Sequence, residues 1–437
     1  MISTLPDPIL HHILSFLEMR YVLQTCILSK RWNSLWTTLS FLTFERHTYG
    51  KTLPLKTEDE FMDYVHKVLL TRDVFTCIHT LRLSYFHVGD DAWLDIVVRR
   101  NIQELDLFIE FGYMEFELPY SLVNCKTLVV LKLEILLEQP DDEEEPTVFV
   151  ELPESVNLPS LKKLVIRTFC FHGEEFMPKV LLNCPVLECL SIRNCGLHES
   201  DRLVVCGTQL KELEINGVFA CEDNHYCEKI CKIVVSAPLL KSFKCSGYIG
   251  NEYLLEDLSS LDKAEADMEV RRSYFDDWEE NVVIPFGRKK RLGMNMVKFL
   301  DGISNAKSLT LSAWVIEVLP RVVEVHPTSF SARHLKVKTW LSKYSIQGIK
   351  YLLENSCNLE TLIVEITKPK VKTAEIWESQ EAAEVVSDYR FCKLRFVEIR
   401  NFQGYVNELE LFKSMLKNAV ALEKLTVLTS RKHSPDS

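Results

Sequence analysis

The chain has 437 residues, of which 47% are hydrophobic and 26% charged, and its formal net charge is -11. This length is too great for one compact core, so it fits several domains or an array of repeats. The acidic balance argues against nucleic acid and against an anionic membrane surface as partners, because both bind basic faces.

The start of the chain and its cysteines indicate the cellular compartment in which the protein is expected. No secretory leader is expected, since polar Ser3 and Thr4 lead straight into the first helical segment. No membrane span is expected either, because the chain lacks a run of about 18 apolar residues. The 14 cysteines lack the spacing of a small disulfide-bonded domain and are typical of buried thiols in a reducing compartment. We therefore expect the protein in the cytoplasm, the nucleus or both.

Residues 7–36 carry the pattern of three short helices. Asp7 is expected to cap the first helix, with Pro8 at its first position, where a missing N–H has no energetic cost. A second helix is predicted over 21–27, and Ser29 is a natural cap for a third. The first helix has apolar residues at helical spacing, namely Ile9, Leu10, Ile13, Leu14 and Leu17, with Phe16 widening the stripe.

Periodicity alone is satisfied equally well by an ordinary helical cap on a larger domain. The particular residues at the two ends of the segment favour a more specific interpretation. Leu5-Pro6-Asp7 at one end and Leu28-Ser29-Lys30-Arg31-Trp32 at the other resemble the F-box over about residues 4–40. The resemblance implies docking on the Skp-type adaptor of cullin–RING ubiquitin ligases.

The adaptor-binding surface is expected to consist of apolar residues from these helices. Some of the candidates must instead form the small internal core, and the sequence does not divide the two groups. At about 1.5–3 kcal/mol for each fully buried large apolar side chain, a few contacts are sufficient for a strong interface. The candidates are Leu5, Pro6, Ile9, Leu10, Ile13, Leu14, Leu28, Trp32 and Trp36.

A Leu-x-x-Leu-x-Leu pattern, with other apolar residues allowed, recurs from residue 78 to the end of the chain. Most copies begin 21 to 35 residues apart, which overlaps the period of about 20–29 for leucine-rich repeats. The gap from Leu261 to Ala306 is about twice as long as usual, so one unit there is degenerate or interrupted. Each copy offers one strand that cannot bury its apolar face alone, so neighbouring units are expected to stack into a curved solenoid. The copies begin at Ile78, Ile102, Leu128, Leu161, Leu187, Leu210, Leu240, Leu261, Ala306, Ala332, Leu359, Leu394 and Leu422.

Strand positions between the apolar ones would line the concave face, the usual binding surface of such arrays. Their charges are mixed and name no ligand, and a solvated strip that binds nothing explains them equally well. Cys125, Cys184 and Cys357 each precede a strand, so we expect them to be structural. The predicted target-binding residues are Lys163, Arg167, Arg193, Glu212, Glu214 and Lys244.

Residues 393–427 predict a strand, a turn at Gly404, a capped amphipathic helix and a closing strand. This segment resembles the FBD domain at the end of plant F-box proteins with leucine-rich repeats. With the F-box first and the repeats between, nearly the whole chain resembles the F-box/FBD/LRR-repeat family. As a terminal unit, the FBD-like segment is expected to seal the open end of the solenoid.

Three clusters of chemically active residues have two interpretations each. A group around His225 lacks a CxxC spacing, so a loop with incidental thiols is favoured over a zinc site. The acidic run Asp141–Glu145 fits a solvated loop better than a docking site for a basic partner. The basic run Arg288–Arg291 fits a surface loop better than a nuclear-import signal. The other members of the first group are Cys221, Asp223, Cys227 and Cys231.

The sequence therefore predicts an α/β fold with an N-terminal three-helix F-box, a curved leucine-rich-repeat solenoid and an FBD-like C-terminal unit that closes it. The expected domains are the F-box over 1–44, a linker or N-terminal cap over 45–76, the repeats over 77–384, the FBD-like domain over 385–430 and a flexible tail over 431–437.

The resemblance implies a substrate-recognition subunit of a Skp–cullin–F-box ubiquitin ligase. Its expected partners are a Skp-type adaptor, through it a cullin scaffold, and an unknown protein substrate. No catalytic residue, cofactor or metal is expected, because no catalytic constellation is present and the contribution is proximity. The alternative is a non-degradative binding scaffold or a small-ligand sensor that uses the repeat solenoid.

Overall fold

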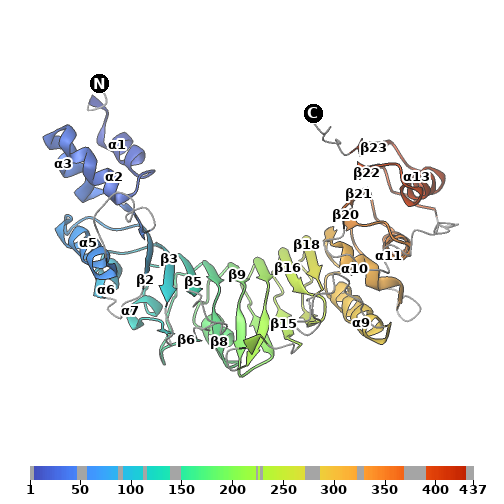
Figure 1. The fold of residues 1–437 in the computed structure, drawn as a ribbon, viewed down its shortest axis with the longest axis horizontal. Coiled ribbons are helices and arrows are strands. Elements are labelled where there is room, and N and C mark those ends of the chain that lie inside the picture. Colours follow the sequence, from blue (N-terminus) through green and yellow to red (C-terminus); the bar gives the residue numbers. More distant parts are fainter. Residues whose placement is uncertain are drawn as a thin grey trace. The chain divides into compact units, whose positions relative to one another are not determined.

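The structure is a computed structural model that describes residues 4–46, 57–86, 92–111, 116–137, 149–222, 225–226, 230–270, 286–321, 329–368 and 390–429. Figure 1 shows the helices and strands in chain order. The chain divides into two compact units. Unit 1 is Met1–Asp201 with Phe219–Lys229, and unit 2 is Arg202–Val218 with Ile230–Ser437. In the part of the chain that is described, no helix combines the length and the apolarity needed to cross a membrane.

Unit 1 begins with short helices, drawn in dark blue in Figure 1. Ser29 is the N-cap of the third, as predicted: its Oγ accepts a hydrogen bond from the Trp32 backbone N–H at 3.4 Å. The prediction that Asp7 caps the first helix is wrong, because Pro6 occupies the N-cap position and the Asp7 carboxylate accepts hydrogen bonds from Arg31 instead. The elements are α1 (Asp7–Leu14), α2 (Met19–Gln24), the 3-10 turn η2 (Thr25–Leu28), α3 (Lys30–Leu35) and the 3-10 turn η3 (Trp36–Thr38).

The strand β1 (Phe41–Glu45) follows these helices directly and is absent from the predicted copies of the repeat. It pairs in parallel with β2 (Thr80–Phe86), and Leu42 is the register partner of Leu81. Leu42 is buried, as is Phe44, the next residue on the same face. The helical segment therefore ends inside the sheet of the repeats, joined to the first predicted copy by strand pairing.

A sheet of parallel strands in unit 1 has the order β1-β2-β3-β5-β7-β9, and a second sheet has the order β14-β13-β10-β8-β6-β4. Parallel pairing places the same repeat position of successive strands side by side, as for Leu105, Leu131 and Leu164, all buried. The strands are β3 (Glu104–Phe111), β4 (Phe116–Glu117), β5 (Val130–Leu137), β6 (Phe149–Glu151), β7 (Lys163–Arg167), β8 (Cys170–His172), β9 (Cys189–Arg193), β10 (Gly196–His198), β13 (Phe219–Glu222) and β14 (His225–Tyr226). The helices are α5 (Glu58–Thr71), α6 (Ala92–Arg99), α7 (Tyr120–Val123) and α8 (Phe176–Leu182).

Unit 2 is built in the same way. Its larger sheet has the order β12-β16-β18-β19-β20-β21-β22-β23, and a smaller parallel sheet has the order β11-β15-β17. The strands are β11 (Arg202–Cys206), β12 (Glu212–Asn216), β15 (Lys232–Ser236), β16 (Ser242–Tyr248), β17 (Glu252–Glu256), β18 (Lys263–Glu269), β19 (Ser308–Leu311), β20 (His334–Thr339), β21 (Thr361–Ile366), β22 (Phe396–Phe402) and β23 (Lys424–Thr429). The helices are α9 (Phe286–Gly302), α10 (Ala313–Val318), the 3-10 turn η4 (Leu319–Arg321), α11 (Lys343–Glu354) and α13 (Val406–Asn418).

Every predicted copy of the Leu-x-x-Leu-x-Leu pattern supplies one strand of these two larger sheets. The long gap in the pattern holds α9. Across this gap β18 pairs directly with β19, with Lys263 and Ser308 as register partners, so the array of strands continues.

The interpretation of Arg288–Arg291 as a surface loop is wrong, because these residues lie in α9, where Lys290 and Arg291 are exposed.

The predicted strand, turn, helix and strand at the C-terminal end are present as β22, Gly404, α13 and β23. Gly404 has φ of +87°, a conformation that L side chains rarely adopt. The buried Glu408 accepts backbone hydrogen bonds at its Oε2 from Gln403 (2.8 Å), Gly404 (2.7 Å) and Tyr405 (3.3 Å). One carboxylate therefore accepts from the N-cap N–H of Tyr405, as in a capping box, and from the two residues of the turn that precede it.

The last strand is less buried than the others. Leu425 and Val427 occupy the core positions of β23 but are only half-buried, whereas their register partners Val397 and Ile399 in β22 are buried. Closure of the array by an FBD-like unit stays a prediction.

The cysteines before the strands differ in burial. Cys125 and Cys184 are buried, as expected for structural residues, whereas Cys357 is exposed. Burial raises the pKa of Cys184 to about 12. A covered thiol with a raised pKa is chemically inert.

Thiol alkylation is expected to separate the cysteines by their burial. Burial also raises the pKa of Cys195 and of Cys245 to about 12, so neither presents thiolate at mildly alkaline pH. Iodoacetamide should modify the exposed Cys206, Cys357 and Cys392 in the native chain, as peptide mass spectrometry would measure. Equal modification of Cys195 and the exposed thiols in native protein would contradict this placement.

Candidate functional site

The apolar residues proposed for adaptor binding divide into a buried, a half-buried and an exposed group. Leu10, Leu14 and Trp32 are 0%, 1% and 2% exposed, so we assign them to the internal core of the helices. Leu5, Ile13 and Trp36 are half-buried. The exposed members are Pro6, Ile9 (47%) and Leu28 (57%).

Besides Tyr21, three apolar side chains of the same segment are exposed and stand outside the predicted set. They are Phe16 (75%), Leu17 and Ile27 (88%). Phe16 and Leu17 lie just after the end of α1, at positions that continue its helical spacing in the sequence, and that spacing was their signal. Ile27 and Leu28 form an apolar pair immediately before the capped α3. Both are exposed in the 3-10 turn that ends there.

We call these exposed and half-buried side chains together the F-box apolar surface. On α1, Ile9 and Ile13 lie one turn apart on one face, with Pro6 at the N-cap before them and Phe16 in the turn after the helix. None of these four residues is charged. A surface of this kind favours an apolar partner surface, since contact would remove both from water. Its members are Leu5, Pro6, Ile9, Ile13, Phe16, Leu17, Ile27, Leu28 and Trp36.

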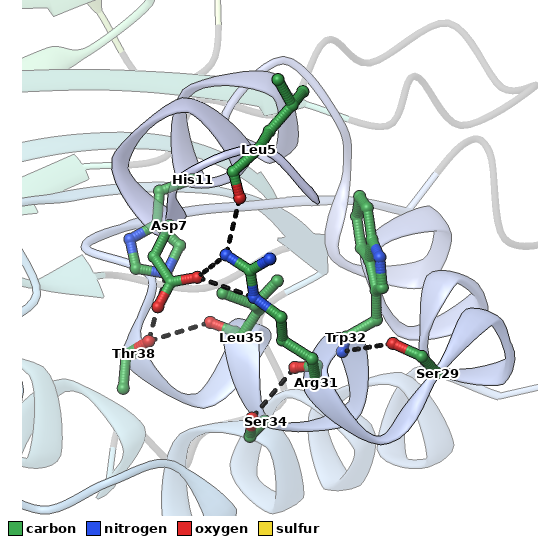
Figure 2. A network of polar contacts seen from close by, with 9 residues as sticks. All are labelled: Leu5, Asp7, His11, Ser29, Arg31, Trp32, Ser34, Leu35 and Thr38. Carbon is green, nitrogen blue, oxygen red and sulfur yellow. Dashed lines mark hydrogen bonds and ion pairs between the residues drawn. The ribbon is translucent and has the colours of Figure 1, made fainter. Parts of the chain in front are cut away.

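Arg31 ties the segment before α1 to α3, as Figure 2 shows. Its Nη2 donates to the Leu5 carbonyl at 2.6 Å, and its Nε donates to Asp7 Oδ1 at 3.0 Å. The ion pair of Arg31 and Asp7 is solvent-accessible, so it contributes little to stability by itself. Its structural effect is to fix where Leu5 and Pro6 lie on the F-box apolar surface.

A second contact joins α1 to the end of α3. The Thr38 hydroxyl donates to the Leu35 carbonyl at 3.0 Å and lies 3.2 Å from His11 Nε2 (Figure 2). With the Ser29 cap at the other end of α3, hydrogen bonds hold this helix at both ends. The F-box apolar surface is therefore presented by a folded scaffold with its own polar links.

The target-binding candidates of unit 1 lie on strand positions between the core rows. Arg167 on β7 pairs with Glu134 on β5, with Nη1 and Oε2 2.8 Å apart. Arg193 on β9 donates from Nε to Ser191 Oγ at 3.1 Å. Lys163 is exposed. The charges on this face are thus partly paired across neighbouring strands.

The candidates of unit 2 have a similar setting. Lys244 Nζ and Glu214 Oε1 are 4.0 Å apart on adjacent strands, and Glu212 is exposed. Further along this sheet, Lys336 Nζ lies 2.7 Å from Glu365 Oε2, and the hydrogen bond from Lys336 lowers the pKa of Glu365. A face of alternating, partly paired charges suits a polar protein surface better than a single highly charged ligand.

Only part of the group around His225 considered for a metal site lies in the described chain. In the described part of the chain, no three His, Cys, Asp or Glu side chains are placed to hold a metal ion. Asp223 and Cys227 lie outside the described residues, as does the acidic run Asp141–Glu145. Cys231 is buried and lies immediately before β15.

Two family models match this chain. The F-box domain model matches residues 2–44. The model described as At1g61320/AtMIF1, LRR domain, matches residues 65–437. Together they cover the helical segment and the repeats.

Proteins of Arabidopsis thaliana are similar over most of this length. The F-box/LRR-repeat protein At4g14103 is 31% identical over 83% of this chain and 90% of its own length. The putative FBD-associated F-box protein At5g53635 is 27% identical over 98% of this chain and 95% of its own length. The F-box/FBD/LRR-repeat protein At1g78750 is 26% identical, with coverage of 98% and 89%.

Proposed function

Because the chain belongs to the F-box/FBD/LRR-repeat family of plant proteins, we propose that it is a substrate-recognition subunit of a Skp–cullin–F-box ubiquitin ligase. F-box domains generally bind Skp-type adaptors, and members of this family are typically non-catalytic. The F-box would hold the adaptor and through it a cullin, while the repeats hold a protein target. The cytoplasm, the nucleus or both are the proposed location.

The observation that carries this proposal is the F-box apolar surface. Ile9, Leu28 and Ile27 remain exposed although the helices have their own buried core of Leu10, Leu14 and other residues. Large apolar side chains gathered on one small module are a sign of a protein partner. Their burial would contribute about 1.5–3 kcal/mol for each fully covered side chain.

The chemical contribution we propose is proximity. A target held on the charged strand positions of the repeats would keep its lysines near a ubiquitin thioester carried by the ligase. Tethering converts a bimolecular encounter into an effectively intramolecular one, which raises the local concentration of the reacting groups. This role needs no nucleophile or general base on the chain. The FBD-like end would complete the array.

The test is reconstitution of the ligase from purified parts. The full-length chain should assemble with a Skp-type adaptor and a cullin–RING pair, and proteins held by the repeats should gain ubiquitin when charged conjugating enzyme is added. Assembly without ubiquitin transfer to a bound target would favour the non-degradative scaffold. Failure of a folded chain to enter the complex would refute the proposal.

A further inference from the structure

A short turn after α5 exposes two consecutive large apolar side chains. Val74 is 67% exposed and Phe75 is 93% exposed. Leu70, in the last turn of α5, is exposed as well. Single exposed apolar residues are ordinary on protein surfaces, but adjacent ones held outward by a fixed backbone are more informative.

The backbone of this turn is held by its own hydrogen bonds. Asp73 Oδ1 accepts from the Phe75 backbone N–H at 3.1 Å, and Asp73 Oδ2 accepts from Thr76 Oγ1 at 3.2 Å. Arg100 Nη1 donates to the Asp73 carbonyl at 3.0 Å, which joins the turn to the end of α6. Little conformational entropy would be lost when a partner covers Val74 and Phe75, since the turn is already ordered.

The same turn is attached to the end of the F-box helices. The Asp73 backbone N–H donates to the Thr37 carbonyl at 3.3 Å. The buried guanidinium of Arg72 donates to the Trp36 carbonyl at 3.1 Å and also to the Leu39 carbonyl. Trp36 is itself a member of the F-box apolar surface. Direct hydrogen bonds to the backbone therefore attach the exposed turn to the end of the helices that carry that surface.

We propose that Val74 and Phe75 extend the adaptor-binding surface beyond the F-box, so that one Skp-type adaptor contacts the F-box helices and this turn together. The F-box model ends at residue 44, so both residues lie outside the module that docks in the family generally. Attachment to Trp36 and Thr37 favours the adaptor over a target protein. The candidate target surface, by contrast, is a set of charged strand positions. This inference rests on the proposed function.

Phe75→Ser in the full-length chain tests the inference. Its matched control is Leu182→Ser, because Leu182 is an apolar residue of unit 1 that is 81% exposed at the end of α8. Neither side chain is part of the core, so both variants should fold, as circular dichroism would check. Titration calorimetry with a purified Skp-type adaptor should show Phe75→Ser binding between about tenfold and about 100-fold more weakly. The Leu182→Ser variant should bind like the unaltered chain.

The outcomes separate this inference from the proposed function. If the unaltered chain binds the adaptor and Phe75→Ser binds equally well, the extended surface is refuted and the proposed function stands. If Phe75→Ser keeps its adaptor affinity but loses a target protein, the turn belongs to the target surface and the inference is again overturned. If the folded, unaltered chain does not bind the adaptor, both fail.

Discussion

A full-length chain carrying Ile9→Asp and Leu28→Asp is expected to bind a Skp-type adaptor at least about 100-fold more weakly than the unaltered chain. Both side chains are about half exposed on the F-box apolar surface. In the free protein the new carboxylates stay hydrated, so the fold should change little. Against an apolar partner they would lose that hydration without gaining an opposite charge. Titration calorimetry would measure the affinity.

The matched control carries Tyr120→Asp and Leu182→Asp. Both residues are exposed and apolar, and both belong to unit 1 but lie outside the F-box. This variant has the same added charge as the first and should keep its adaptor affinity. Equal binding by the two variants would mean that the F-box apolar surface is not the adaptor contact.

Replacing Trp32 by alanine is expected to lower the stability of the F-box helices by about 3–5 kcal/mol. Trp32 is buried between the helices, so the substitution leaves a cavity that neighbouring side chains fill only in part. Amides of α1, α2 and α3 should then exchange hydrogen at least about 100-fold faster, as mass spectrometry would measure. Adaptor binding would weaken because the folded F-box is less populated.

Asn33→Ala is the control for that substitution. Asn33 is the exposed neighbour of Trp32 on the same helix, so its truncation should leave hydrogen exchange nearly unchanged. A Trp32→Ala variant with unaltered exchange but weakened adaptor binding would assign Trp32 to the interface and contradict its place in the core.

The repeats were accessible to sequence reasoning because one strand position recurs from copy to copy. Parallel pairing then makes equivalent residues register partners, as Leu131 and Leu164 are. The strand β1 shows the limit of that reasoning. Leu39, Leu42 and Phe44 carry the same Leu-x-x-Leu-x-Leu spacing, but they lie at the end of a segment assigned to the F-box. Because these residues were assigned to the F-box, their fit to the repeat pattern was missed.

The division of the F-box residues needed the structure for another reason. On α1, Ile9 and Leu10 are neighbours in one wide apolar stripe, and spacing alone gives both the same status. In the folded chain Leu10 is buried and Ile9 is about half exposed. Asp7 was misassigned for a similar reason. A cap is a local contact, whereas its actual partner Arg31 is distant in sequence.

The exposed turn at Phe75 could not have been found by spacing at all. Its sequence follows α5 without a repeat or a motif. Its importance depends on the backbone contacts of Asp73 and Arg72 with the end of the F-box helices. Such contacts join residues more than thirty positions apart, and nothing in the local pattern indicates them.

Titration of the full-length chain with a purified Skp-type adaptor tests the central claim most directly. We expect a saturable one-to-one complex, which the Ile9→Asp, Leu28→Asp variant should form at least about 100-fold more weakly under the same conditions. No binding by a full-length chain that circular dichroism shows to be folded would contradict it.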